Sequence, residues 1–340
     1  MSKRKLSRRQ AWRIEKIQKE REKRAARRDE NTGERLGESD LGPEIEGLIV
    51  THYGTQVMVE NPAEQTLKRC HFRSNLGGLV TGDRVIWRDG NPYGVVVART
   101  ERDSALMRPD PYGDLKTVAA NIDRIVIVIA PYPEPHFNLV DRYLVAAESI
   151  GIEPALVINK VDLIDDDQRD KVERIHALYA GLGYTVILAS AKRDEGLLPL
   201  REYLAHYTSV FVGQSGVGKS SLVNALLPDA NSRVGALSEK QTGTHTTTSA
   251  QLYHIDTGGD LIDSPGIREF GLWHIEPEDV LAGFKEFRPY IGACKFRDCS
   301  HSHEPGCAIL QALDDGEISA GRLAGYRRIL ADLHPGRSGY

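Results

Sequence analysis

The chain has 340 residues, of which 40% are apolar and 27% charged, and its formal net charge is −4. These values are typical of a soluble globular protein with room for two or three domains. The longest apolar run, residues 125–130, is far too short to cross a bilayer, and the charged N-terminus lacks the apolar segment of a signal peptide. Three of the four cysteines cluster near the C-terminus, which argues against a disulfide framework. We therefore expect a cytoplasmic protein with no membrane partner.

The N-terminal segment carries a strong positive charge. Residues 1–28 contain 13 Lys and Arg against three Glu, a net charge of +10, so the remainder of the chain carries −14. A basic arm on an acidic body is typical of a nucleic-acid tether, although a solvated tail without a partner would have the same composition. Residues 31–42 are rich in Gly, Glu and Asp and indicate a linker, so we assign 1–43 to the arm and linker.

Residues 44–103 show the periodicity of short strands. The predicted strands lie in the ranges 45–60 (two strands with a turn at Tyr53-Gly54), 66–73, 80–88 and 93–100. Five short strands in this length favour a small closed β-barrel, with the OB-fold as the leading candidate. Such a barrel could bind an oligonucleotide or serve only as a packing module. Cys70 stands alone on a strand and is predicted to be a small buried side chain.

Residues 104–271 are predicted to form an α/β domain. Strands are expected at 124–130, 153–158 and 185–188, with helices at 138–150 and 166–181. Polar segments follow two of the strands, at the carboxyl ends where ligands bind in open α/β sheets. They are Asn159-Lys160-Val161-Asp162 and Ser190-Ala191-Lys192.

The N-K-x-D segment has the chemistry to recognise guanine. The Asp162 carboxylate could accept hydrogen bonds from guanine N1 and its 2-amino group, donors that adenine lacks. The Lys160 stem could lie along the base, and Asn159 could bond either the base edge or a phosphate-binding loop. Backbone N–H groups of Ser190, Ala191 and Lys192 could face the guanine oxygen.

A phosphate-binding loop with the pattern G-x-x-x-x-G-K-[ST] follows the apolar strand 209–212 and opens a helix over 221–227. Its glycines let backbone N–H groups surround phosphate oxygens, and the helix N-terminus adds positive potential. Lys219 would reach the β- and γ-phosphates, and the Ser220 hydroxyl would bind Mg²⁺. The whole predicted loop is Gly213, Gln214, Ser215, Gly216, Val217, Gly218, Lys219, Ser220 and Ser221.

A D-x-x-G segment follows a predicted hairpin of strands 249–255 and 260–262. Asp263 is expected near the Mg²⁺ shell and the Gly266 N–H at the γ-phosphate. The preceding polar loop, residues 238–249, contains Thr246, Thr247 and Thr248, one of which is expected to contact the metal once γ-phosphate orders the loop.

The order of these motifs is unusual. Small GTPases run from the phosphate loop through the switch Thr and D-x-x-G to N-K-x-D and S-A-K, whereas here the last two come first. The domain is therefore predicted to be circularly permuted, a change that folds tolerate when the ends lie at the surface.

The C-terminal part, residues 272–340, carries the pattern C-x₄-C-x-H-x₅-C. Three thiolates and one imidazole can complete a tetrahedral structural zinc site, with His303 as a competing fourth ligand by spacing. The candidate ligands are Cys294, Cys299, His301 and Cys307. Helices are predicted at 278–287, 308–313 and 317–333; the last carries Arg322, Arg327 and Arg328, which could face phosphate or solvent.

Taken together, residues 44–335 resemble the ribosome small subunit-dependent GTPase A (RsgA, or YjeQ) family. The resemblance implies an N-terminal OB-fold that contacts rRNA, a permuted GTPase domain and a C-terminal zinc-binding helical domain. It implies binding of GTP or GDP with Mg²⁺ and one structural Zn²⁺, and it selects His301 over His303 as ligand. It further implies a GTPase that binds the small (30S) ribosomal subunit late in its maturation and is stimulated by it. We expect a monomer.

The resemblance also concerns the catalytic residue. Many GTPases have a water-orienting Gln just after D-x-x-G, but here that position is Ile267, which cannot hydrogen-bond water. His245 is the candidate catalytic residue, and the resemblance assigns its loop position that role; the alternative is that His245 only shapes the loop and the ribosome supplies the group.

Two other functions remain open. The chain could be a permuted GTPase switch acting on a non-ribosomal protein or RNA partner, or an ATP-dependent nucleic-acid enzyme. Asp162 argues against the second, because adenine cannot pair with a buried carboxylate in this way.

Overall fold

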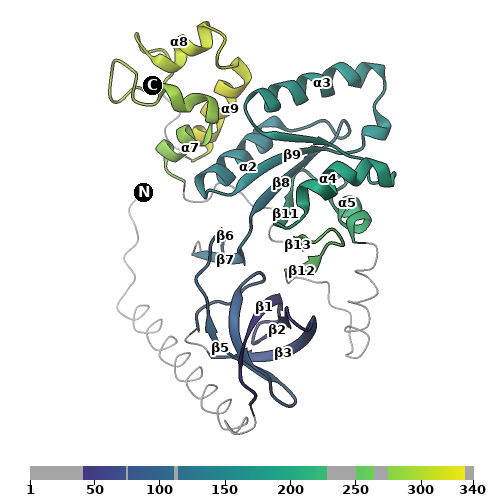
Figure 1. The fold of residues 1–340 in the computed structure, drawn as a ribbon. Helices are drawn as coiled ribbons and strands as arrows, with labels where there is room; N and C mark the ends of the chain where they lie inside the picture. The colour runs from purple at the N-terminus through teal and green to yellow at the C-terminus, as the bar shows by residue number, and fades with distance from the viewer. Residues whose placement is uncertain (1–40, 74–75, 111–113, 228–249, 264–274, 334–340) are drawn as a thin grey trace, which may run out of the picture. The chain divides into compact units, whose positions relative to one another are not determined.

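The computed structural model of the chain describes residues 41–73, 76–110, 114–227, 250–263 and 275–333 (Figure 1). The chain divides into two compact units, and the boundary falls between Arg102 and Asp103. Among the described residues, no helix is both long and apolar enough to span a membrane.

The first unit is a closed barrel of five strands. They are β1 (Glu44–His52), β2 (Gln56–Asn61), β3 (Thr66–Phe72), β4 (Arg84–Arg88) and β5 (Gly94–Arg99). β1 pairs with both β2 and β4, and the parallel pair β3–β5 completes the ring. Inward side chains alternate along each strand and meet in one core, which contains Ile49, Val57, Val59, Cys70, Leu79, Val85, Trp87 and Val96. The prediction that Cys70 is buried is confirmed, since its exposed fraction is 0%.

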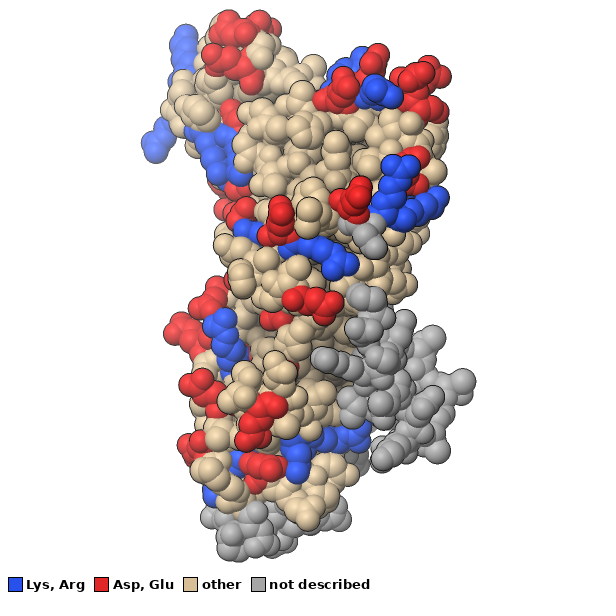
Figure 2. Space-filling view, turned by 45° about the vertical axis from the view of Figure 1, so that its right-hand side comes forward, with Lys and Arg blue, Asp and Glu red and all other residues tan. Residues whose placement is uncertain are grey.

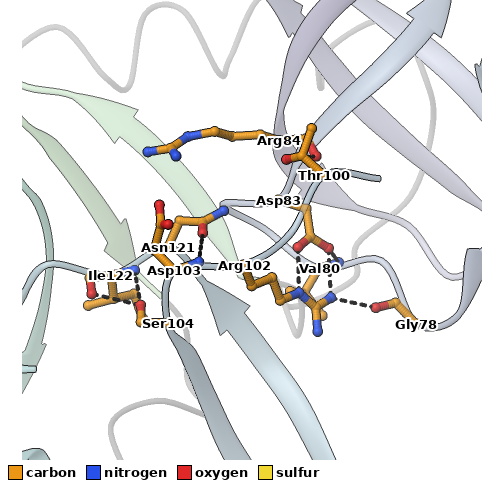
Figure 3. A network of polar contacts seen from close by, with 10 residues as sticks. All are labelled: Gly78, Val80, Asp83, Arg84, Thr100, Arg102, Asp103, Ser104, Asn121 and Ile122. Carbon is orange, nitrogen blue, oxygen red and sulfur yellow. Dashed lines mark hydrogen bonds and ion pairs between the residues drawn. The ribbon is translucent and has the colours of Figure 1, made fainter. Parts of the chain in front are cut away.

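Polar contacts fix the last residues of the first unit (Figure 3). Arg102 forms a two-point ion pair with the buried Asp83, with Nε–Oδ1 at 2.6 Å and Nη2–Oδ2 at 2.8 Å. The Val80 N–H donates to the same carboxylate, and Arg102 also donates to the Gly78 carbonyl. The barrel therefore ends at a firmly held residue.

The second unit begins with a hairpin that the sequence did not predict. It consists of β6 (Ala105–Pro109) and β7 (Leu115–Ala120), whose antiparallel register shifts between Leu106 and Met107. Side chains hold the ends of the hairpin together: Asn121 Oδ1 accepts from the Asp103 N–H, and the Ser104 hydroxyl bonds both backbone groups of Ile122 (Figure 3).

The main sheet of the second unit has the strand order β10-β9-β8-β11-β13-β12. All neighbours are parallel except β12, which is antiparallel to β13. The strands are β8 (Arg124–Ile129), β9 (Glu153–Ile158), β10 (Thr185–Leu188), β11 (Thr208–Val212), β12 (Gln251–His254) and β13 (Asp260–Asp263). The predicted strands in this region are thus present, within one or two residues at their ends.

Helices cover both faces of this sheet (Figure 1). They are α2 (Phe137–Ser149), α3 (Asp166–Gly181), α4 (Leu198–Leu204) and α5 (Lys219–Leu226), with short 3₁₀ turns η3 (Val161–Leu163) and η4 (Asp194–Leu197). Val126 and Val128 of β8 share a core cluster with residues of α4 and α5, whereas Ile129 and Ile158 lie on the side of α2 and α3. Because side chains alternate along a strand, the continuous apolar run of β8 serves both faces.

The C-terminal helices pack against α2. They are α7 (Pro277–Gly283), the 3₁₀ segment η5 (Lys285–Tyr290), α8 (Ala308–Asp314) and α9 (Ala320–Leu333), and both α7 and α9 contact α2. The single helix predicted at 278–287 is interrupted at Phe284, whose backbone is extended. The preceding residue, Gly283, lies so close to α2 that a Cβ there would be 2.7 Å from Val145 Cγ1. α9 begins later than predicted because the Ser319 side chain accepts from the Arg322 N–H and caps the helix.

The described surface shows acidic and basic side chains interspersed on the face drawn in Figure 2. Among the residues coloured there, Lys and Arg form short groups between Asp and Glu, with no continuous basic patch. The strong positive charge that the sequence places in residues 1–28 falls outside the described residues.

Candidate nucleotide site and metal cluster

The predicted nucleotide-binding segments follow neighbouring strands at one edge of the parallel sheet. Asn159 follows β9, Ala189 follows β10, Gly213 follows β11, and Asp263 is the last residue of β13. Since β8, β9, β10, β11 and β13 are parallel, their carboxyl ends lie at the same edge. Strand pairing therefore brings together segments that are up to 104 positions apart in the sequence.

Asn159 connects the N-K-x-D segment with the phosphate-binding loop. Its side chain is 1% exposed, and Nδ2 donates to the Val217 carbonyl at 2.9 Å. Of the two roles considered from the sequence, the loop contact is the one observed. Asn159 Oδ1 is buried and has no hydrogen-bond partner among the described residues. An unpaired buried acceptor is unfavourable, so this atom fits a site that receives a further donor.

Lys160 also bonds the phosphate-binding loop. Its backbone is in the left-handed region, at φ 62°, and its Nζ donates to the carbonyls of Gly216 at 2.6 Å and Tyr132 at 2.9 Å. Both acceptors lie on segments that follow other strands of the sheet. The lysine side chain thus crosses the edge where a base would lie.

Asp162 is held by the segment that follows β10. The Ser190 hydroxyl donates to Asp162 Oδ1 at 2.6 Å, and Lys192 Nζ lies 3.4 Å from Oδ2. The hydrogen bond from Ser190 and, to a smaller degree, the bond and charge of Lys192 lower the pKa of the Asp162 carboxyl. Asp162 is therefore a charged acceptor at neutral pH, as pairing with two N–H donors requires.

The remaining residues of these two segments have structural contacts. The Val161 N–H donates to the Ala189 carbonyl, Ala191 packs against the core, and the Lys192 N–H donates to the Ser190 hydroxyl. Hydrogen bonds therefore connect the N-K-x-D segment directly with the segment that follows β10.

The phosphate-binding loop depends on glycine at two positions. Gly213 has φ 137°, and a Cβ there would collide with the Val128 carbonyl of β8. Gly218 has φ 95°, and a Cβ there would collide with Asn159 Nδ2. The glycines therefore permit both the backbone conformation and the close approach of neighbouring segments.

The Lys219 side chain folds back onto the phosphate-binding loop. Its Nζ donates to the carbonyls of Gly213 at 2.7 Å and Gln214 at 2.6 Å. Ser215, Gly216, Ser220 and Ser221 are exposed, whereas Val217 is buried in the core. The loop therefore presents its backbone and hydroxyl groups outward at the start of α5, as phosphate and Mg²⁺ binding require.

Several predicted residues lie outside the described residues. They are His245, Thr246, Thr247, Thr248, Gly266 and Ile267. Asp263 is described: β13 pairs with β11, and Ile262 is the neighbour of Val210 in that register. This places Asp263 beside the strand that leads into the phosphate-binding loop.

Sequence reasoning missed the contribution of residues 131–136, which follow β8. Tyr132 accepts from Lys160, Pro133 lies 3.6 Å from a Cβ built on Gly216, and the His136 N–H donates to Gln214 Oε1. Their position after a buried parallel strand was the available signal, since every such strand end lies at the ligand edge.

The four predicted metal ligands come together in one cluster. The ligand atoms of Cys294, Cys299, His301 and Cys307 lie within 4.8 Å of one another. Cys294 Sγ is 3.6 Å from His301 Nδ1 and 3.9 Å from Cys307 Sγ. A tetrahedral zinc ion with Zn–S bonds of about 2.3 Å places two sulfurs roughly 3.8 Å apart, so the spacing fits that ion.

Neighbouring residues fix the conformation of the histidine. His301 has φ 56°, and its carbonyl accepts from Arg327 Nη2 at 2.7 Å. Glu304 accepts from the Ser300 hydroxyl and from the N–H groups of Ser300 and Ser302, and these hydrogen bonds, the hydroxyl's above all, lower the pKa of its carboxyl. His303 contributes only its backbone N–H to Glu304 and does not belong to the cluster.

The protonation states also favour a cation. Burial, together with Cys307 and Cys294, raises the pKa of the Cys299 thiol to about 12. Burial lowers the pKa of the His301 imidazole. The nearby charge of Arg327 lowers it further and that of Glu304 opposes the shift, so the imidazole is neutral. A neutral imidazole beside three closely spaced sulfurs fits a bound metal ion, whose positive charge would favour the Cys299 thiolate.

One expectation for α9 is wrong. Arg322 faces neither phosphate nor solvent: its side chain is 3% exposed and forms ion pairs with Asp141 and Glu286. Arg327 binds the metal-cluster loop, and Arg328 is exposed. The desolvated guanidinium is tolerated because two carboxylates neutralise it.

Comparison with known proteins assigns the chain to a family. Residues 99–273 match the family described as "RsgA GTPase". A "Small ribosomal subunit biogenesis GTPase RsgA" of Ectopseudomonas mendocina is 57% identical over 338 residues and 98% of each chain. The protein of the same name from Pseudomonas aeruginosa is 58% identical over 335 residues, again covering 98% of each chain.

Solved structures agree with this assignment. The crystal structure of YjeQ from Thermotoga maritima has a TM-score of 0.72 and 33% identity, and the match covers 87% of this chain and 100% of that chain. The structure of YloQ, described as "a circularly permuted GTPase", has a TM-score of 0.70 and 30% identity, with 88% and 98% covered. The chain therefore belongs to the RsgA GTPase family and is a GTP hydrolase whose GTPase motifs are circularly permuted.

Proposed function

We propose that this chain binds the small ribosomal subunit late in its maturation and hydrolyses GTP there, with turnover stimulated by the subunit. Its membership of the RsgA GTPase family makes it a GTPase of small-subunit biogenesis. The proposal of nucleotide binding rests on two hydrogen bonds at the carboxyl edge of the sheet. The Asn159 side chain donates to the Val217 carbonyl, and the Ser190 hydroxyl donates to the Asp162 carboxylate. These contacts join base-reading and phosphate-binding segments into one site.

Each segment has a distinct proposed role in binding GTP or GDP. The Asp162 carboxylate, whose pKa is lowered, accepts from guanine N1 and the 2-amino group, and the backbone around Ala191 faces the guanine oxygen. Backbone N–H groups of residues 213–218 hold the phosphates, and Lys219 leaves its carbonyl partners to reach the β- and γ-phosphates. Ser220 binds Mg²⁺, with Asp263 beside it.

Hydrolysis is proposed to depend on His245. A water-orienting group is needed because Ile267 stands where many GTPases have Gln. An imidazole in the threonine-containing loop has suitable reach and chemistry, and Gly266 is proposed to contact the γ-phosphate.

The Cys294, Cys299, His301 and Cys307 cluster is proposed to hold one structural Zn²⁺. With three sulfurs and one nitrogen the tetrahedral shell is complete, which leaves no position for a reacting water. The ion would fix the loop that precedes α8 and thereby the C-terminal helices.

The domain order follows from these assignments. We propose a basic arm and linker (1–43), an OB-fold barrel that contacts rRNA (44–103), the permuted GTPase domain (104–271) and a zinc-binding helical domain (272–340). The closed barrel with order β1-β2-β3-β5-β4 supports the second assignment. The net charge of +10 in residues 1–28 makes the arm a candidate for salt-dependent attraction to RNA. A ribosomal partner would place the protein in the cytoplasm.

Two experiments test the proposal. GTP should displace a labelled GDP from the purified chain at a concentration at least a hundredfold below that of ATP; equal competition would contradict the role of Asp162. The chain should sediment with purified small subunits more strongly with a non-hydrolysable GTP analogue than with GDP, and RNase treatment should abolish this. Nucleotide binding without any co-sedimentation would instead favour a non-ribosomal partner.

A further inference from the structure

A cavity of about 550 Å³ lies in the second unit between α2, α3 and the start of α9. This volume falls within the range of about 300–1,000 Å³ that is typical of small-molecule sites. None of the predicted nucleotide-binding residues in 159–162, 190–192 and 213–221 lines it. The cavity therefore lies beside the proposed GTP site and meets it only at the segment that follows β8, through Tyr132.

The walls of the cavity are mostly apolar. Ile129 and Ile158 line it from the ends of β8 and β9, and Val172, Ile175 and Leu178 line it from α3. Phe137 and Leu178 remain 43% and 36% exposed, which is unusual for large apolar side chains in a concave site. Covering such surface removes apolar area from water and so favours binding. The cavity therefore favours a ligand with an apolar body.

The charges around the cavity favour an anionic group on that ligand. Arg322 pairs with both Asp141 and Glu286, and Lys171 Nζ lies 3.6 Å from Glu134 Oε1. Arg174 also lines the cavity and is exposed, and the described part of the chain provides no ion pair for it. The Arg174 guanidinium is thus available to pair with an anionic group of a ligand at the wall formed by α3.

We propose that this cavity binds an amphipathic organic anion, with an apolar body against Phe137, Ile175 and Leu178 and a single carboxylate, sulfonate or phosphate group at Arg174. Apolar walls with one available cation match this ligand class more closely than a polar metabolite or a cation.

The cavity shares a wall with the proposed nucleotide site. The Gln168 amide donates to the Tyr132 hydroxyl at 2.8 Å, and both residues line the cavity. The Tyr132 carbonyl accepts a hydrogen bond from Lys160 Nζ, which also donates to the Gly216 carbonyl. A ligand that moves Tyr132 therefore changes a contact of the N-K-x-D segment. This coupling rests on the proposed function and is reciprocal: bound anion changes the affinity for the nucleotide by the same factor as bound nucleotide changes the affinity for the anion.

The binding step is tested with the probe 8-anilinonaphthalene-1-sulfonate and the full chain. We expect saturable binding of one probe per chain, weakened at least tenfold by Arg174→Glu and by Leu178→Glu. The matched controls are Arg169→Glu on the exposed face of α3 and Leu198→Glu at the start of α4, neither of which lines the cavity. Equal binding by cavity variants and controls would overturn the proposal. If Leu178→Glu fails to fold, Arg174→Glu still tests the proposal, because Arg174 is exposed and its substitution leaves the core unchanged.

The coupling step is tested by calorimetry. The Kd for GDP should change at least threefold when the probe is saturating, and this change should disappear in Arg174→Glu. An unchanged Kd with bound probe would overturn the coupling. Failure of GDP to bind at all would contradict the proposed nucleotide site, and probe binding would still be measured independently.

Discussion

Arg322 of α9 forms an ion pair with Asp141 of α2, and the two side chains are only 3% and 4% exposed. Arg322 Nε also lies 2.5 Å from Glu286 Oε1, and its guanidinium lies 4.4 Å from the Phe284 ring centre. α9 approaches so closely here that a Cβ on Gly325 would collide with the Asp141 carboxylate. This contact is a buried electrostatic link between the C-terminal helices and the helix that follows β8.

Substitution of Arg322 should destabilise the second unit strongly. Arg322→Met leaves the carboxylates of Asp141 and Glu286 buried without their cation, and the loss of one partner from a buried pair costs about 3–5 kcal/mol. Urea unfolding measures the change. The control is Arg142→Met, because the Arg142–Asp332 pair is 32% and 49% exposed and should contribute about 1 kcal/mol or less. Equal effects of the two substitutions would contradict the buried link.

The same pair predicts a pH dependence. Burial raises the pKa of Asp141 to about 6, although Arg322 opposes the shift. The folded chain thus binds this proton more tightly than the unfolded chain, whose carboxyl has a pKa near 3.8. The contribution of Asp141 to the free energy of unfolding is therefore greatest below about pH 4 and is lost as the pH rises through 6.

The magnitude of this loss is on the order of 2 kcal/mol. Urea unfolding at several pH values between 4 and 7 measures it, with Asp141→Asn as the reference, since an amide does not titrate. The wild-type stability should fall more steeply than that of the variant over this interval. Parallel curves would show that Asp141 keeps an ordinary pKa.

Gly218→Ala should weaken nucleotide binding. The new Cβ would collide with Asn159 Nδ2, and φ 95° is strained for alanine, so the bond from Asn159 to the phosphate-binding loop should break. We expect at least a tenfold loss of GDP affinity in a fluorescence titration. Gly151→Ala is the matched control, because Gly151 has φ 70° with open space around it. It should cost about 1 kcal/mol of stability and leave GDP affinity unchanged.

These residues also indicate what the sequence could predict. The strands and the polar segments at their carboxyl ends follow from local patterns, and the order of motifs predicted the permutation. Asn159 left two roles open because its bond to Val217 spans 58 positions, and no local pattern encodes such a contact. The β6–β7 hairpin was missed because its strands mix charged and apolar residues and its register shifts in the middle.

Arg322 shows the limit more sharply. Arginines on an amphipathic helix are ordinarily exposed, so the sequence offered only phosphate or solvent as the surroundings of Arg322. Its burial depends on Asp141 and Glu286, which are 181 and 36 positions away. The cavity likewise depends on how three helices meet, so only the three-dimensional structure reveals it.

His245→Ala should separate GTP binding from turnover. The residue lies outside the described residues, and its predicted role rests on the sequence. Loss of the group that orients the attacking water should lower subunit-stimulated turnover by about a hundredfold or more and leave the Kd for GTP intact. Lys219→Ala serves as the contrast, because it should lose affinity itself. Turnover near that of the wild type would refute the catalytic role.

The metal cluster allows a test with two neighbouring histidines. His301 Nδ1 lies 3.3 Å from Cys307 Sγ, whereas His303 offers only its backbone N–H to Glu304. The purified chain should contain about one zinc per molecule by elemental analysis. His301→Ala should lose most of it and unfold at a lower temperature, since binding of a structural zinc ion stabilises the folded state.

His303→Ala is the matched control and should keep both its zinc and its unfolding temperature, because the backbone bond to Glu304 remains. A chelator should lower the unfolding temperature of the wild type and of His303→Ala to that of His301→Ala, and should change His301→Ala little. Equal zinc loss from the two variants would contradict the ligand set. Full zinc content in His301→Ala would indicate that the zinc ion binds elsewhere in the chain.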